Sequence, residues 1–201
     1  MHPIRLMNIT AFALSFVALS CSVSTAFAQD PIQPISDKQR FQWALQTSVS
    51  PARMGGSLIS SAFSTWTNQP EEFGPGWSGY GKRFATRIAT GAMQNYMEAG
   101  VASIWDEDPR YIRRGSGSIG SRIGYAMKMT VLARRSDGSL MPAYARYVAI
   151  TAASGASMAY RPASERTAGQ FTIRIPMSLI GRAAGNSFSE FWPDVSSKLR
   201  R

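Results

Sequence analysis

Carboxylates are nearly the only side chains that could carry acid–base chemistry in this chain once it is processed. Its single histidine and single cysteine, His2 and Cys21, lie in an N-terminal segment typical of an export signal. Without them a Ser–His–Asp triad, a Cys–His dyad and a His/Cys zinc site cannot be built. The sequence also has no phosphate loop or dinucleotide fingerprint. We therefore expect no metal site and no cofactor, and the weak catalytic candidates are four acids, Glu98, Asp106, Asp108 and Glu190.

Asp106 and Asp108 belong to the densest polar cluster of the sequence, in which arginines follow the acids closely. The acids could bind a hard cation or act as an acid–base pair, but the D-x-D-x-D-G spacing of a calcium loop is missing. We favour a turn in which the acids pair with the arginines that follow.

Glu98 and Glu190 have similar structural explanations. Glu98 shares a predicted helical face with Arg83 and Arg87, so we expect a solvated or ion-paired carboxylate. Glu190 and Asp194 flank an aromatic residue, as in some sugar sites, but a glycosidase pair must face each other across a cleft. We therefore lean toward a protein that is not an enzyme.

Basic and aromatic residues indicate contact with an anionic surface. The chain carries 22 Lys and Arg against 12 Asp and Glu, a net charge of +10, and loses only Arg5 with the signal. We expect anionic lipid, an acidic envelope polymer, or a membrane or envelope protein as partner, and no nucleic acid; simple solubility charge is the alternative. The residues we assign to anionic-surface binding are Trp77, Tyr80, Lys82, Arg83, Arg87, Arg110, Arg113 and Arg114.

Residues 1–28 are predicted to be a signal peptide. Arg5 precedes an apolar run at 9–19, and Ala26-Phe27-Ala28 forms an A-x-A cleavage site. The predicted location is the periplasm or cell envelope, with possible membrane association. Lipidation of Cys21 and retention of the segment as an uncleaved anchor are the alternatives.

The remaining sequence predicts an all-α fold, a single domain of about five closely packed Gly/Ala-rich helices over 50–201 after a polar lead at 29–49. Ser50 and Pro51 are a helix start, and Pro176 should kink or divide the last helix. A β-barrel is the competing fold, but most segments follow helical spacing better. The expected helical ranges are 51–67, 79–104, 118–134, 142–159 and 167–191.

The helix at 79–104 has two faces at 100° per residue. Phe84, Ile88 and Ala99 lie on an apolar face of mostly small residues, which lets a partner helix approach closely, whereas Glu98 lies on the polar face. Asn95 falls within the apolar face and should need a buried partner.

Three motifs occur in order along the chain: residues 76–84 (GWSGYGKRF), 108–111 (DPRY) and 190–194 (EFWPD). This G-x-G-K-R-F, D-P-R-Y and F-W-P-D layout resembles a group of uncharacterised exported bacterial proteins, from about Trp66 onward. The resemblance implies no activity, substrate or catalytic residue.

The leading functional hypothesis is a non-enzymatic binding or structural module at an anionic membrane surface. Two alternatives stay open: a carboxylate-based hydrolase of an envelope polymer, and a membrane-inserted helical oligomer that uses the 143–159 helix.

Overall fold

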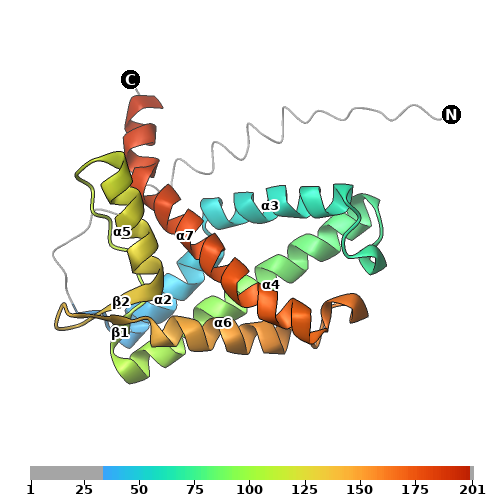
Figure 1. Cartoon of the computed structure of the whole chain (residues 1–201), viewed down its shortest axis with the longest axis horizontal. Coiled ribbons are helices and arrows are strands. Elements are labelled where there is room, and N and C mark those ends of the chain that lie inside the picture. The colour runs from blue at the N-terminus through green and yellow to red at the C-terminus, as the bar shows by residue number, and fades with distance from the viewer. Residues whose placement is uncertain (1–33, 200–201) are drawn as a thin grey trace. The chain divides into compact units, whose positions relative to one another are not determined.

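The computed structural model describes residues 34–199, which belong to one compact unit (Figure 1). The predicted signal peptide and Cys21 lie outside the described residues. The predicted all-α fold is confirmed, with one small sheet added. In chain order the elements are α2 (Asp37–Ser48), α3 (Pro51–Trp66), the 3₁₀ turn η1 (Glu71–Phe73), α4 (Gly76–Trp105), β1 (Glu107–Asp108), α5 (Ile119–Val131), β2 (Leu132–Arg135), β3 (Leu140–Pro142), α6 (Tyr144–Ser157), the 3₁₀ turn η2 (Ala163–Glu165) and α7 (Ala168–Leu199).

Serine side chains cap three of the helices at their first turn. The Ser50 hydroxyl accepts a hydrogen bond from the Arg53 amide, and Pro51 occupies the first turn of α3, as predicted. Ser36 forms a capping box with Gln39 and starts α2 within the stretch expected to be a polar lead. Because α2 packs against α4, the stretch expected to be a polar lead contributes a packed helix.

Helix α4 is the centre of the packing. Helices α2, α3 and α6 lie against it, and α7 packs along α5 and α6 (Figure 1). Ala99 and Ala102 of α4 and Ala149 and Ala153 of α6 are fully buried. Small side chains let helix backbones approach closely, as the sequence predicted.

A three-stranded antiparallel sheet interrupts the helices at 107–142. β2 pairs with β1 on one side and β3 on the other, with Glu107 opposite Arg135. The helix predicted at 118–134 therefore ends at Val131, and Pro142 belongs to β3 instead of opening α6. The hairpin turn at 136–139, in which Gly138 has a φ of +84°, folds β3 back onto β2, and this pairing competes with further helix.

Helix α7 is continuous for 32 residues with Pro176 and Pro193 inside it. Of the two outcomes expected at Pro176, a kink or a division of the helix, division does not occur. A proline removes one backbone hydrogen bond of the helix, and the helical turns on either side of Pro176 keep their own backbone hydrogen bonds.

The helices turn polar side chains inward and large apolar side chains outward. In α2, Arg40, Ala44 and Ser48 are buried, whereas Phe41 and Leu45 are exposed. In α5, every fourth residue from Ile119 to Val131 is at least partly open to solvent. The exposed apolar side chains of α7 are Ile173, Met177, Ile180, Phe188, Trp192, Val195 and Leu199.

Both the polar and the apolar face of α4 contribute buried side chains. Arg83 and Glu98 of the polar face, and Asn95 and Ala99 of the apolar face, are among the most buried side chains of the described residues, whereas Ala85 is exposed. Hydrogen bonds and ion pairs to neighbouring segments hold the polar side chains of α4 inside. Among residues 34–199, no helix is both long enough and apolar enough to cross a membrane.

Candidate functional site: buried arginine–carboxylate clusters

Glu98 joins three helices through two arginines. Its carboxylate, 1% exposed on α4, accepts a hydrogen bond from Arg146 Nε of α6 at 3.0 Å and another from the Arg182 guanidinium of α7. Arg182 also stacks over Trp43 at 5.3 Å. Burial lowers the pKa of Arg182 to about 10, and the charge of Glu98 opposes that shift. The predicted ion-paired carboxylate is confirmed, but its partners are not Arg83 and Arg87.

The neighbouring turns of α4 complete this cluster. Asn95 donates from Nδ2 to Ser48 Oγ of α2 at 3.0 Å, which confirms the predicted buried partner. The Arg53 guanidinium lies against Gly91, where a Cβ atom would come within 1.7 Å of Arg53 NH2. The absence of a side chain at Gly91 therefore leaves room for the Arg53 guanidinium.

Glu190 of α7 binds the segment at 111–115, which follows β1. Its fully buried carboxylate accepts from Tyr111 Oη at 2.7 Å, from the amides of Arg114 and Gly115 at 3.0 and 2.9 Å, and from Arg122 Nε at 2.9 Å. Burial raises the pKa of this carboxyl, but the hydrogen bond from Tyr111 and the other donors outweigh burial and lower it. Glu190 is an ionised acceptor in a structural junction.

The acids at 106–108 bind partners in different parts of the chain. Asp108 binds the guanidinium of Arg110 at 2.7 Å, as predicted. Asp106 pairs instead with Arg40 of α2 at 3.0 Å and accepts from Ser136, whose hydrogen bond lowers the pKa of Asp106. The left-handed backbone at Asp106 (φ +55°) turns the chain out of α4, which separates its side chain from the following arginines.

Glu107, between them, is a buried acid that the sequence did not single out. Its carboxylate accepts from the Ala145 amide at the start of α6 at 3.1 Å. Burial raises the pKa of Glu107, and the Ala145 amide opposes this. The four candidate acids thus each bind different partners.

Some of the residues assigned to anionic-surface binding are exposed, and others are bonded to groups within the protein. Trp77 is 88% exposed, and Lys82 and Arg114 are exposed. Arg83 is buried and donates to the carbonyls of Gln69, Pro70 and Gly74 at 2.7–2.8 Å, so its assignment to the surface was wrong. These carbonyls lie on either side of η1, and the guanidinium of Arg83 supplies hydrogen-bond donors to all three.

Three more of these arginines are partly buried and already bonded. Arg87 donates to Ser64 Oγ at 2.5 Å. Arg110 binds Asp108, and Arg113 donates to the Glu190 carbonyl at 3.2 Å and pairs with Asp194. Of the predicted basic set, Lys82 and Arg114 are therefore the exposed members.

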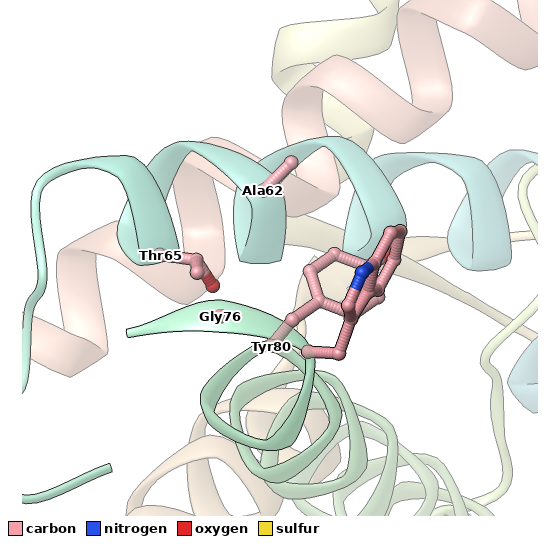
Figure 2. Close-up of a pocket in the computed structure, with 5 residues that line it drawn as sticks. Ala62, Thr65, Gly76 and Tyr80 are labelled. Carbon is pink, nitrogen blue, oxygen red and sulfur yellow. The ribbon is translucent and has the colours of Figure 1, made fainter. Parts of the chain in front are cut away.

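A shallow pocket of about 390 Å³ lies between α3 and the start of α4 (Figure 2). Ala62 and Thr65 of α3 line it together with Gly76, Trp77 and Tyr80 of α4. The Trp77 and Tyr80 rings meet edge to face at 5.9 Å. The aromatic–basic motif of the sequence thus forms an apolar recess, and Tyr80 also stacks on Phe84.

Sequence reasoning missed the arginines that balance the buried acids. Arg146 gave a signal, because it interrupts a helix that is otherwise apolar or small. Arg122 and Arg182 gave none, since exposed arginines at helical spacing look the same in sequence.

Within residues 34–199 no group of three or more His, Cys, Asp or Glu side chains is arranged to hold a metal ion.

No protein-family profile, curated protein or solved structure matches the chain.

Proposed function

We propose that this protein is a non-enzymatic module of the bacterial cell envelope that binds an anionic membrane by placing its outward apolar side chains in the lipid. The observation that carries the proposal is the inverted arrangement of the helices, with ion pairs inside and large apolar side chains outside. In water, soluble monomers rarely expose contiguous apolar patches of more than a few hundred Å². A helix that lies at a membrane interface buries its apolar face in the acyl boundary.

Helices α5 and α7 present the longest apolar surfaces. On α5 the stripe repeats every four residues, and on α7 it extends from Ile173 to Leu199. The exposed Trp66 and Trp77 lie near the junction of α3 and α4, and tryptophan is enriched where a membrane meets water. These features favour lipid as the occupant.

The charge of the chain favours lipid over a second copy of the protein. Two chains of net charge +10 repel each other, whereas anionic headgroups attract them. Apolar side chains are also exposed on several helices, which a continuous lipid phase covers more readily than one isologous contact.

The buried acids support a non-enzymatic module. Glu98 and Glu190 each receive two or more charge-assisted or amide hydrogen bonds, so neither is poised as a general acid. This argues against the polymer-hydrolase alternative.

Vesicle flotation tests the proposal. The purified chain should float with vesicles of phosphatidylglycerol and phosphatidylcholine, and less with phosphatidylcholine alone or at high salt. The double variant Met177→Gln/Ile180→Gln should bind about tenfold more weakly, since it loses apolar area at two exposed positions. The matched control is Thr172→Gln/Ser189→Gln, which places the same side chains at exposed polar positions of α7.

All variants keep the same N-terminus, so differences between them report on α7. Failure of the chain to bind anionic vesicles at low salt would refute the proposal. So would equal binding by the two double variants. A discrete oligomer that excludes lipid would show instead that copies of the chain cover these faces.

A further inference from the structure

Two arginines from separate parts of the chain bind one carboxylate, and a third arginine lies nearby on α4. Arg161, which follows α6, donates to Glu165 Oε2 at 2.5 Å and to Thr90 Oγ1 of α4 at 3.2 Å. Arg174 of α7 lies 3.5 Å from the same Glu165 oxygen and donates to the Glu165 carbonyl at 2.6 Å. Arg87 lies on α4 one turn before Thr90.

The cluster has more positive charge than Glu165 balances. Burial lowers the pKa of Arg87 and of Arg174, and the positive charge of Arg161 lowers both further, while Glu165 opposes the shift in each. Arg83 adds a smaller effect of the same sign on Arg87. Three guanidinium groups thus share the field of one carboxylate.

Two of these arginines also have donor atoms left over. Arg87 Nε and Arg174 NH1 are shielded from solvent, and no group among the described residues accepts a hydrogen bond from them. A buried donor without an acceptor is costly, and more so when it is charged. The NH2 atom of Arg87 donates to Ser64 Oγ, and the NH2 atom of Arg174 donates to the Glu165 carbonyl.

The hydroxyl groups of Thr90 and Tyr160 lie beside Arg161. Thr90 Oγ1 is 2.9 Å from Tyr160 Oη, and either atom can donate. Glu72, an acid that reaches this segment, is engaged by the amide and hydroxyl of Ser164 at 3.1 and 2.9 Å. Guanidinium groups with nearby hydroxyls are the donor set that proteins use for phosphate.

We propose that Arg87, Arg161 and Arg174 form a binding site for a phosphate-type oxyanion. The anion would accept hydrogen bonds from the free donors of Arg87 and Arg174 and would balance the surplus charge. Phosphate can come from a lipid headgroup, in which case the site rests on the proposed membrane function, or from a free phosphate in the envelope.

Calorimetric titration of the purified chain tests the site with two probes, inorganic phosphate and short-chain phosphatidic acid below its micelle concentration. Arg174→Gln and Arg87→Gln should each weaken binding about tenfold, because each removes one charge-assisted contact. Arg174→Lys should retain part of the affinity. The matched control, Arg135→Gln, removes one exposed arginine outside the site and should leave the affinity unchanged.

Binding of both probes identifies phosphate itself as the ligand, and binding of phosphatidic acid alone identifies a lipid headgroup. The site is refuted if neither probe binds, or if Arg135→Gln weakens binding as much as Arg174→Gln does. Circular dichroism checks the fold, and Arg174→Lys keeps the test decisive where Arg174→Gln does not fold. Because inorganic phosphate needs no vesicle, failure here leaves the flotation result standing, and failure of flotation leaves phosphate binding testable.

Discussion

Replacing Glu98 by Gln should destabilise the fold more than any exposed acid can. Glu98 is 1% exposed and is the counter-ion of Arg146 and Arg182, whose side chains are 4% and 13% exposed. Glutamine keeps the size of the side chain and removes the charge. The two guanidinium groups would then lie in the interior without their carboxylate.

The magnitude follows from that burial. Removing one partner of a buried ion pair costs about 3–5 kcal/mol. At about 2–4 °C per kcal/mol for a chain of this length, the melting temperature should fall by roughly 6–20 °C. The remaining contacts of Arg146, which donates to the Met129 and Thr130 carbonyls at 2.9 and 2.6 Å, place it toward the lower end of that loss.

Thermal and urea unfolding followed by circular dichroism provide the measurement. Glu71→Gln is the matched control, since it makes the same chemical change at an exposed position and should stay within about 0.5 kcal/mol of the unchanged chain. A double-mutant cycle with Arg182→Met should give a coupling energy of about 1 kcal/mol or more. The reasoning fails if Glu98→Gln costs less than about 1 kcal/mol, or if the cycle shows no coupling.

Two further predictions concern the C-terminal junction and the centre of α4. The folded state lowers the pKa of Glu190, so the unfolded chain binds its proton more readily; the contribution of Glu190 to stability should be complete above the ordinary glutamate pKa and lost as the pH falls through the lower folded value. Urea titrations across that acid range should show a weaker pH dependence for Glu190→Gln, and an unchanged slope would contradict this. Gly91→Ala should cost about 1–3 kcal/mol because the new methyl group meets Arg53, whereas Gly100→Ala, with no atom within 4 Å, should be neutral or stabilising by up to about 1 kcal/mol. Equal melting temperatures for the two alanine variants would show that Arg53 moves aside freely.

Local patterns in the sequence were enough to predict most of the helices. Ser50 and Pro51 start α3, and the 79–104 prediction differs from α4 by a few residues. Such signals act through the backbone of a single turn, so they need no knowledge of the rest of the fold. The sheet was missed because strands of two to four residues depend on pairing with segments far along the chain.

The sequence by itself determined the helical class, the positive charge and the small side chains that allow close packing. Only the tertiary structure decided which face of each helix is buried. Helical periodicity separates Glu98 from Ile88, but it does not say which of the two faces meets a neighbouring helix. In this chain Arg146 and Arg182 reach Glu98 from other helices, and these long-range ion pairs turn the polar face inward. Which apolar side chains of α5 and α7 stay exposed also depends on how the helices pack, and no single segment of the sequence specifies that packing.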